Sequence, residues 1–581
     1  MSFRIILLLL LFSSISVAQT QITKSYFLTC NFNHDADHVG KYLHYSHTFA
    51  DSSQAYIQIQ SILNALNTQS YFLATLDDVY WRNDSCMATI SIGNKLIINK
   101  LNKGNLPEWL LKKIDFKETY FENKVFKPET IASLCSRTLS FSQDHGYPFA
   151  SIKLDSIAIE NQQLNASVNF KFGPFFKFDT LLIAGKTNIK RQFLENYLRI
   201  ESGEVYSQEK VDNIARAIQQ LPYLKLTGPI NVFFNSGTVR VELILEDVKS
   251  NQVDGIVGLL PNAQKDGGVM LTGEFNLVLR NLFQTGKMIK GEWRRFQEAS
   301  QLLNLEYLHP NVLHSDFDVS GAFNFLKQDS TFLNINRKFS LFYRLNSTGK
   351  LSLNIGYLSA RIGSNRTLKS ATVLPSFADF DYVSYGLGYD FNSVDNLFYP
   401  RKGLLLHVDI AIGNKVISKN AIFDSKLYDP IALKSVMMVG NVSIEKFIRV
   451  AGNSVFLLKT VGGKIVNKTI FFNDLYRLGG LKSLRGFNDN YFYASDFNIN
   501  TVEFRQYIDE TSYLLLFAEQ SYLYYNLAAG KLLDYPTGLG AGVSFTSGPG
   551  IFSFVYSVGK SKQQQMSLNQ SKIHFGFISR F

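Results

Sequence analysis

One arginine of this chain has a setting that suggests a specific partner. The stretch LGGLKSLRGF, residues 478–487, places Arg485 next to a glycine on a long polar loop. A guanidinium group is always charged and offers five donors in a fixed fork that matches carboxylates. Two carboxylates follow on the next alternating segments, Glu503 in TVEFRQ and Glu519 in LLLFAEQ. Considered alone, the tripeptide Arg-Gly-Phe favours a solvated surface turn, and only its surroundings can favour a buried ion pair.

A second group of polar side chains could bind a metal ion. Histidine and aspartate ligate zinc and related ions, and six of them lie between residues 34 and 47. A polar segment near the start of the mature chain would have the same composition, and we favour that interpretation. We predict no metal and no other cofactor. The six residues are His34, Asp35, Asp37, His38, His44 and His47.

Other chemistry finds little support in the sequence. The chain contains no HExxH, P-loop, CxxC or GxSxG motif, and no helix is expected after the glycines of GLGAG, residues 538–542. We therefore predict that the protein is not an enzyme. The three cysteines are Cys30, Cys86 and Cys135. In an exported chain one pair could be bridged and one thiol left over, and the sequence does not select the pair.

The N-terminus and the composition indicate an exported membrane protein. An apolar run and the small residues Ser16-Val17-Ala18 predict a signal peptide over residues 1–18. No later run approaches the length of a transmembrane helix, so a membrane-embedded chain would have to form a barrel. Charged residues make up only 18% of the 581 residues and aromatic residues 14%. The net charge of +11 is mild for this length and includes no basic block, so we expect no nucleic-acid partner.

Residues before about 249 show a repeated pattern of strands and helices. The clearest helix is SQEKVDNIARAIQQL, residues 207–221, whose apolar residues recur at helical spacing. Two strands follow it, and a strand and a short helix precede it. Repetition of one such unit predicts a modular arm, which could grip extended chains at its sheet edges. We place the repeats at 19–94, 95–173 and 174–248, the first being the least regular.

After residue 249 the pattern changes to short alternating segments. In IKGEWR, for example, Ile289, Gly291 and Trp293 oppose Lys290, Glu292 and Arg294. Apolar-out and polar-in alternation is typical of a transmembrane barrel, and the 333 residues (581 − 248) accommodate about sixteen strands. A soluble β-sandwich also alternates, but it usually needs far fewer residues. The chain ends on an alternating apolar stripe made of Ile573, Phe575, Phe577 and Phe581. Such an end resembles the terminal strand by which outer-membrane barrels are recognised for insertion.

Together these parts resemble the BamA/TamA family of outer-membrane assembly factors, also called bacterial surface antigens. The carrying motifs are Arg485-Gly486-Phe487 ahead of five expected strands, GYPFA at residues 146–150, IKRQFLENYLRIESGEVYSQEKVD from Ile189, and DNLFYPRKGLLL at residues 395–406. The resemblance implies α+β periplasmic POTRA repeats followed by an antiparallel transmembrane β-barrel of about sixteen strands, residues 249–581. It also implies that the loop folds into the barrel and that Arg485 meets carboxylates at Glu503 and Glu519. The chain departs from the family in having a glutamate at 519 rather than an aspartate, and Ser521 where the family has a glycine.

The implied function is assembly of other outer-membrane proteins. The arm would bind client polypeptides in the periplasm, and the barrel would insert them where its first and last strands meet. The implied partners are client outer-membrane or exported polypeptides and outer-membrane lipid, with periplasmic chaperones or accessory lipoproteins as further partners. Two alternatives stay open: a dedicated transporter that exports one passenger polypeptide through the barrel, and, less favoured, a passive pore.

Overall fold

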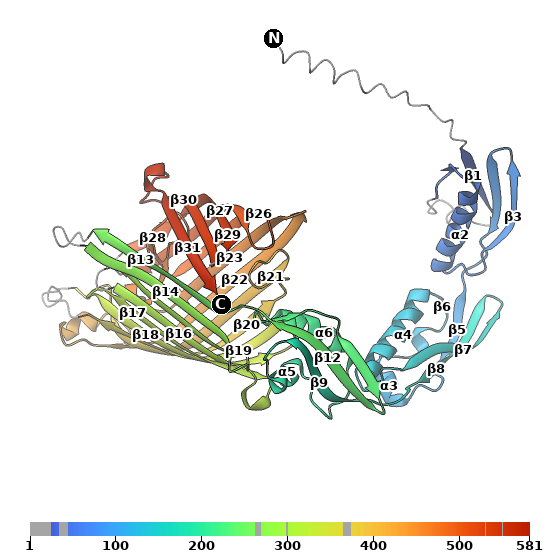
Figure 1. Ribbon diagram of the computed structural model, residues 1–581, viewed down its shortest axis with the longest axis horizontal. Helices are drawn as coiled ribbons and strands as arrows, with labels where there is room; N and C mark the ends of the chain where they lie inside the picture. The colour runs from blue at the N-terminus through green and yellow to red at the C-terminus, as the bar shows by residue number, and fades with distance from the viewer. Residues whose placement is uncertain are drawn as a thin grey trace, which may run out of the picture. The chain divides into compact units, whose positions relative to one another are not determined.

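The computed structural model describes residues 25–33, 45–261, 269–297, 300–363, 373–528, 530–548 and 550–581. The predicted signal peptide and the five histidines and aspartates between residues 34 and 44 lie outside this part of the chain. The chain divides into two compact units, residues 1–177 with 205–208, and residues 178–204 with 209–581 (Figure 1). Among the described residues, no helix is both long enough and apolar enough to cross a membrane.

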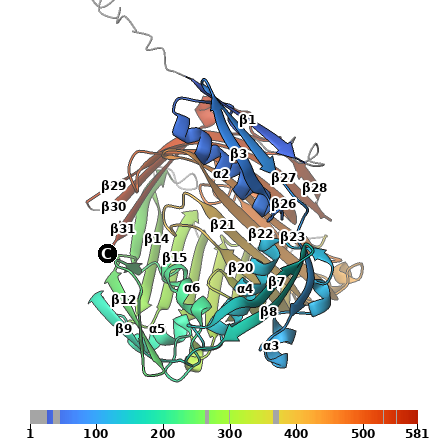
Figure 2. The ribbon, with the colours of Figure 1, turned by 90° about the vertical axis from the view of Figure 1, so that its right-hand side faces the viewer.

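The first compact unit contains two small sheets, each covered by helix. In the first sheet the strand order is β2-β1-β4-β3, and helix α2 lies along it (Figure 2). Asp51 caps this helix by accepting a hydrogen bond from the amide of Ser53 at 3.0 Å. The side chains of Ala55, Ile59, Ile62 and Leu66 are buried because their spacing puts them on one face. The elements are β1 (Tyr26–Asn33), β2 (Thr48–Phe49), α2 (Ser52–Thr68), β3 (Thr75–Arg82) and β4 (Ser85–Ser91).

The second sheet repeats this plan with the order β6-β5-β8-β7. Its inner strands, β5 and β8, run parallel, as β1 and β4 do in the first sheet. Helix α4 starts with Pro128 in its first turn, where the missing amide hydrogen costs nothing, and it buries Ile131 and Leu134. The elements are β5 (Ile97–Asn102), α3 (Glu108–Lys113), η2 (Glu118–Tyr120), β6 (Lys124–Val125), α4 (Pro128–Gln143), β7 (Ser151–Glu160) and β8 (Gln163–Lys171).

A third sheet with two helices precedes the barrel and belongs to the second compact unit, apart from Lys177 and residues 205–208. Strand β12 lies between β10 and β11 and also pairs with β9. Helix α6 buries Val211, Ile214, Ala217 and Ile218, four of the residues that make the segment amphipathic. The elements are β9 (Lys177–Lys186), α5 (Arg191–Leu198), α6 (Gln208–Gln219), β10 (Leu224–Leu226), β11 (Asn231–Asn235) and β12 (Thr238–Asp247).

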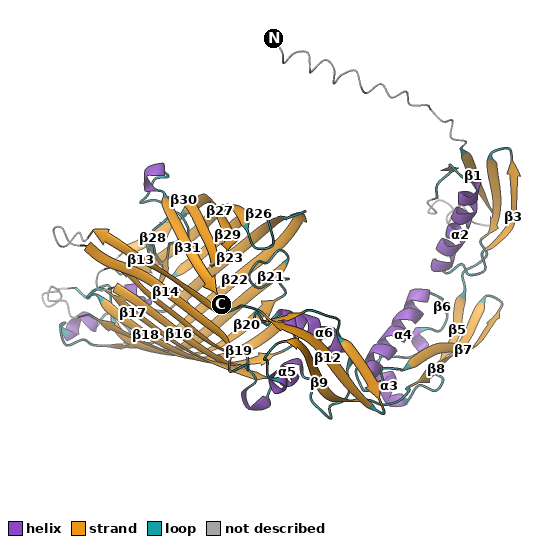
Figure 3. Cartoon of the chain, viewed as in Figure 1, coloured by secondary structure: helices purple, strands orange, loops and turns teal. Residues whose placement is uncertain are grey.

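The rest of the chain forms a closed antiparallel barrel of sixteen strands, as the sequence predicts. In the described part of the chain the α-helices all precede the barrel, whose loops contain only short 3-10 helices (Figure 3). The strand position next to β27 is divided between two segments, so seventeen labelled strands fill sixteen positions. Residues 513–520 of β27 pair with β29, and residues 523–527 pair with the short β28. The strands are β13 (Gln252–Pro261), β14 (Val269–Leu282), β15 (Lys287–Gln297), β16 (Ser300–His309), β17 (Phe317–Gln328), β18 (Phe332–Arg344), β19 (Gly349–Ile362), β20 (Asp379–Asn392), β21 (Gly403–Ser418), β22 (Lys434–Ala451), β23 (Ser454–Val466), β26 (Asp496–Tyr507), β27 (Tyr513–Leu527), β28 (Gly530–Asp534), β29 (Thr537–Ser547), β30 (Gly550–Lys560) and β31 (Lys572–Arg580).

Alternation along the strands gives the barrel an apolar outer wall and a polar lumen. On β15 the side chains of Ile289 and Trp293 are exposed on the outside, whereas Glu292 and Arg294 are enclosed. On β19, further round the barrel, exposed side chains are again apolar, such as Leu353 and Ile355. A wall of this kind fits a surface surrounded by lipid.

The first and last strands close the barrel through a short register. Between β13 and β31 the paired residues are Gln252 with Arg580 and Val253 with Ser579. By contrast, β13 pairs with β14 over ten positions, from Gln252 to Pro261. Among the described residues the seam is therefore hydrogen-bonded only at the end from which the third sheet extends.

The third sheet and its helices dock on the barrel turns at that end. Arg344, the last residue of β18, donates to the carbonyl oxygen of Tyr197 at 2.8 Å and pairs with Asp318 at 3.2 Å. Arg199 of the helical region pairs with Asp316 at 2.7 Å. The side chains of Arg344 and Asp318 are almost completely buried, so this ion pair belongs to a packed interface.

Candidate functional site

The candidate site is the segment between β23 and β26, residues 467–495, which we call the lumenal loop. It contains a two-stranded hairpin of β24 (Tyr476–Leu478) and β25 (Phe492–Ala494). The side chain of Phe487 is fully buried and packs edge-on against Phe492, at 4.8 Å between ring centroids. Loop residues Leu478 and Leu484 share the same apolar cluster with strand residues Ile499 and Leu523. The loop thus has a core of its own on the inner wall of the barrel.

Arg485 is enclosed and contacts two carboxylates. Its Nε atom lies 2.7 Å from Oε1 of Glu519, and its Nη1 atom lies 2.7 Å from Oε2 of Glu503. Its backbone amide also donates to Oε2 of Glu519 at 2.8 Å. The side chain of Arg485 is 11% exposed, so it is not a solvated arginine on a surface turn. The structure brings together the three residues that the sequence analysis singled out, and we call them the Arg485 anchor.

Two further residues complete this cluster. Arg505 pairs with the other oxygen of Glu503 at 2.7 Å, so that glutamate lies between two guanidinium groups. The ring of Phe517 lies under the guanidinium of Arg485, 3.4 Å from its central carbon to the ring centroid. With two arginines and two glutamates the cluster is formally neutral, which suits its burial.

The loop backbone fits against strands β29 and β30 because glycines stand there. Gly486 itself has φ +91°, which favours glycine. A Cβ atom added to Gly538 would lie 2.4 Å from the carbonyl oxygen of Arg485, and one added to Gly559 would lie 2.7 Å from that of Gly486. The amide of Gln564 donates to the carbonyl oxygens of Gly486 and Gly559, at 3.2 and 3.1 Å. Gly538, the first glycine of GLGAG, therefore leaves the space into which the loop backbone packs.

The start of the loop is held by a second buried ion pair. Nζ of Lys415 on β21 lies 2.5 Å from Oδ2 of Asp474, and both side chains are almost fully buried. The ammonium group also lies over the rings of Phe380 and Phe471, at 4.4 and 5.3 Å from their centroids. Phe380 and Phe471 belong to an apolar cluster formed by the loops and strand ends at the barrel end far from the third sheet.

Sequence reasoning missed several of these residues, although some left a signal. Arg505 follows Glu503 by two positions, so the two side chains share a face of the strand. Phe517 and Leu515 have the same parity as Glu519, and the structure turns all three inward. Lys415, Asp474 and Gln564 carry no such local signal, because their partners are distant in the sequence.

The remaining predicted residues lie elsewhere. On β31 the side chains of Ile573 and Phe575, and beyond it Phe581, are exposed, and the ring of Phe577 packs against Phe552 at 4.8 Å. Of the histidine and aspartate group only His47 is described, and its Nδ1 atom lies 3.4 Å from the carbonyl oxygen of Leu28. Among the described residues no group of three or more possible ligands could hold a metal ion. All three cysteines are free thiols, so the possible bridge is absent from this structure.

Comparisons with known proteins identify the fold. No family model matches the sequence, and no curated protein sequence matches it. The structure resembles that of CdiB from Escherichia coli, with a TM-score of 0.55 and 12% identity over 91% of this chain and 97% of that chain. CdiB from Acinetobacter baumannii gives the same score and identity over 91% and 98%. BamA from Haemophilus ducreyi lacking POTRA domains 1–3 gives 0.41 and 13% over 84% and 100%, a score too low to support an argument. At these identities the comparisons establish a shared sixteen-stranded barrel fold.

Proposed function

We propose that this chain is an outer-membrane protein that inserts client polypeptides at the seam between β13 and β31. Its three small sheets would be POTRA repeats in the periplasm, and the clients would be outer-membrane or exported polypeptides. No cofactor and no covalent chemistry are required, because strand pairing itself supplies the driving force. Outer-membrane lipid surrounds the barrel, and periplasmic chaperones or accessory lipoproteins are further partners.

The short register of the seam carries this proposal. Only two residue pairs join β13 and β31 in the described part of the chain. Unpaired backbone groups at a sheet edge form a template for another strand. In the hydrocarbon region a client strand gains most from such an edge, because lipid offers its backbone no hydrogen bonds.

Export of a passenger through the lumen is the alternative mechanism. It would require the apolar cluster at the far end of the barrel, which includes the fully buried Phe380, to move apart. The buried Lys415–Asp474 pair would also have to break. That packing favours a lateral route. A passive pore would give no role to the arm or to the anchored loop.

Depletion of the protein in cells separates these functions. Insertion of clients predicts that many different outer-membrane barrels decline together, as measured by quantitative proteomics of the outer membrane. Dedicated export predicts that one secreted protein disappears while the barrels stay constant. Unchanged barrels and secreted proteins would contradict both functions.

A further inference from the structure

We infer that Lys482 and Asp489 are positioning residues that anchor the lumenal loop to the first strands of the barrel, so that the loop connects the two sides of the seam. Their partners are Glu274 on β14 with Glu292 and Arg294 on β15, and we call these five residues the Lys482 anchor. Its importance for client insertion rests on the proposed function, whereas its effect on the seam does not.

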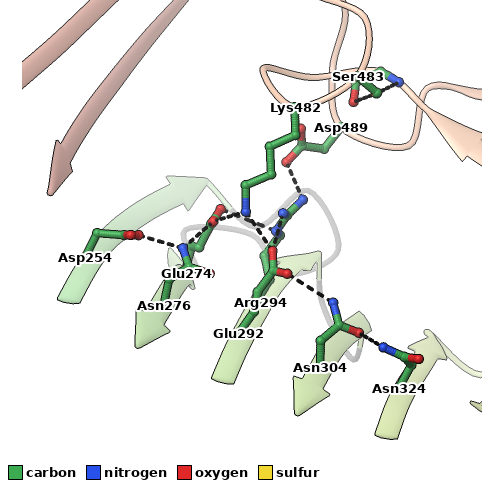
Figure 4. A network of polar contacts seen from close by, with 11 residues as sticks. Asp254, Glu274, Asn276, Glu292, Arg294, Asn304, Asn324, Lys482, Ser483 and Asp489 are labelled. Atoms are coloured by element: carbon green, nitrogen blue, oxygen red, sulfur yellow. Dashed lines mark hydrogen bonds and ion pairs between the residues drawn. The ribbon is translucent and has the colours of Figure 1, made fainter. Parts of the chain in front are cut away.

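The contacts of Lys482 define the anchor. Its Nζ atom lies 2.7 Å from Oε1 of Glu274 and 2.7 Å from Oε1 of Glu292 (Figure 4). One ammonium group therefore bridges two neighbouring strands from above, as the sticks in the figure show. Asp489 of the same loop lies 3.3 Å from Nη1 of Arg294. The loop thus contributes one cation and one anion, each opposite a group of the other sign.

The partners on the wall are themselves held in place. Arg294 pairs with Glu292 at 2.8 Å and with Glu274 at 3.3 Å. Asn276 donates to Glu274 at 2.7 Å, and Asn304 donates to Glu292 at 3.0 Å. Such hydrogen bonds fix the carboxylates before the loop arrives, which reduces the entropy lost when the anchor forms.

The two anchors lie on opposite sides of the seam. The Arg485 anchor fixes the loop to β26 and β27, among the last strands, and Lys482 reaches the second and third strands. Only two residues lie between Lys482 and Arg485 in the sequence. Because the seam between them has only two residue pairs in the described part of the chain, this short segment is a second connection across it.

Burial distinguishes the two anchors. The side chain of Lys482 is 57% exposed, against 11% for Arg485. An exposed ion pair is weaker and is screened by salt, whereas a buried arginine cannot leave without stranding its carboxylates. We therefore expect Arg485 to stay in place while Lys482 detaches, which would let the first strands move away from the last.

The net charge of the Lys482 anchor also favours detachment of the loop once Lys482 is neutralised. The anchor contains two cations, Lys482 and Arg294, and three carboxylates, Glu274, Glu292 and Asp489, so its net charge is −1 (2 − 3). Removing the charge of Lys482 would make it −2. Asp489 would then face two carboxylates on the wall with only Arg294 between them, and repulsion would push the loop away.

The test measures the width of the seam in the full-length protein. Nitroxide labels are attached to Phe275→Cys on β14 and Phe554→Cys on β30, both exposed on the outer wall, after Cys30, Cys86 and Cys135 have been replaced by alanine. Pulsed electron spin resonance then gives the distance distribution in lipid vesicles. We expect Lys482→Gln to raise the population with longer distances about two- to fivefold, in keeping with the loss of a weak pair.

A matched control and a rescue make the result specific. Lys464→Gln removes an ion pair of the same length, 2.7 Å to Asp496, that joins the neighbouring strands β23 and β26 away from the seam, and it should leave the distribution unchanged. Lys482→Arg, which puts the cation back at this position, should restore the parent distribution. Heat-dependent gel migration checks that each variant is folded, and 1 M NaCl should widen the seam of the parent without any substitution in the anchor.

Two results would overturn the inference: a parent-like distribution for folded Lys482→Gln, or a seam that is insensitive to salt. Equal widening by Lys464→Gln would show that the effect is not specific to the seam. Client insertion is assayed separately in the same vesicles. A seam that widens in a protein that inserts no client would refute the proposed function and leave the anchor intact, whereas insertion without any widening would refute the anchor alone.

Discussion

Arg485 is the residue whose environment most clearly indicates a role. It donates three hydrogen bonds to two buried carboxylates, and these carboxylates lie on different strands. A lysine could supply the charge but not the planar fork that reaches both glutamates. The position therefore requires arginine for its shape as well as for its charge.

A double-mutant cycle tests this pairing. Arg485→Ala should leave the barrel inserted but expose the lumenal loop to protease, with a cost of about 3–5 kcal/mol that arises mostly from the stranded carboxylates. Combining it with Glu519→Gln should cost clearly less than the sum of the two single changes. Arg485→Lys should recover little. Strict additivity of the two changes would show that the residues are not coupled.

The close approach of the loop backbone to Gly538 predicts a second effect on the same loop. In Gly538→Ala the new methyl group would meet the carbonyl oxygen of Arg485 at 2.4 Å, so the loop must shift, at a cost of about 1–3 kcal/mol. The control is Gly440→Ala on β22, where an added Cβ meets nothing within 4 Å. Limited proteolysis of the loop measures the shift. Equal protection in both variants would show that packing of the loop does not depend on a glycine at position 538.

The thiol of Cys30 gives a prediction for pH. Burial raises its pKa to about 11, an effect partly offset by the hydroxyl group of Tyr45. The folded arm thus disfavours the thiolate, so the stability contributed by Cys30 is present below its unfolded pKa of about 8.5 and is lost as the pH rises through about 11. At pH 8 iodoacetamide should modify Cys30 roughly a hundredfold more slowly in the folded protein than in urea. Mass spectrometry of its peptide measures both rates, and similar rates would contradict the burial.

Among the elements, the sequence predicted strands and helices well and side-chain facing less well. The helix expected at residues 207–221 and the five strands expected after the loop all occur, because a clear periodicity and glycine or polar turns mark them. The interruption of one strand position between β28 and β29 was not anticipated, since both halves alternate. The inward facing of Leu515 and Phe517 also escaped prediction, because an apolar side chain on a barrel strand is normally expected to face lipid.

The candidate site could be predicted only where its residues are close in sequence or recognisable as a motif. Arg485 and its two glutamates could be named because the resemblance to the BamA/TamA family places the loop inside the barrel, where a buried arginine is costly unless carboxylates pair with it. Lys482 and Glu274 were not paired, because 208 positions separate them and nothing local links them. Contacts of this kind depend on closure of the barrel, which a strand pattern indicates but does not resolve residue by residue.

The docking of the third sheet on the barrel turns gives a prediction about how these elements are held together. Arg344→Ala removes the hydrogen bond to Tyr197 and leaves Asp318 buried with only Lys350, at 3.5 Å, as an ionic partner. We expect a loss of about 3 kcal/mol in docking, at the lower end for a broken buried pair, and faster proteolysis at residues 248–251. Arg361→Ala breaks a more exposed pair with Asp381, between neighbouring strands, and is the control. Equal cleavage of the two variants would contradict the docking role.

At the scale of the whole molecule, closure of the barrel should be detectable by gel electrophoresis. A correctly inserted sample should migrate faster on a semi-native gel before boiling than after, because the hydrogen-bonded barrel remains compact in mild detergent. The Lys464→Gln variant should behave in the same way. Identical migration before and after boiling would contradict a stable barrel.

The Lys482 anchor also has a consequence for the order of folding. Its contacts join residues 208, 190 and 195 positions apart, which are among the largest sequence separations in the polar contacts of the barrel. Contacts between such distant residues must wait until the intervening chain is arranged, so they form late and slow the overall rate. During refolding into detergent, protection of the lumenal loop from protease should therefore appear after the strands have paired. Attachment of Lys482 would then mark the moment at which the chain has finished its own assembly.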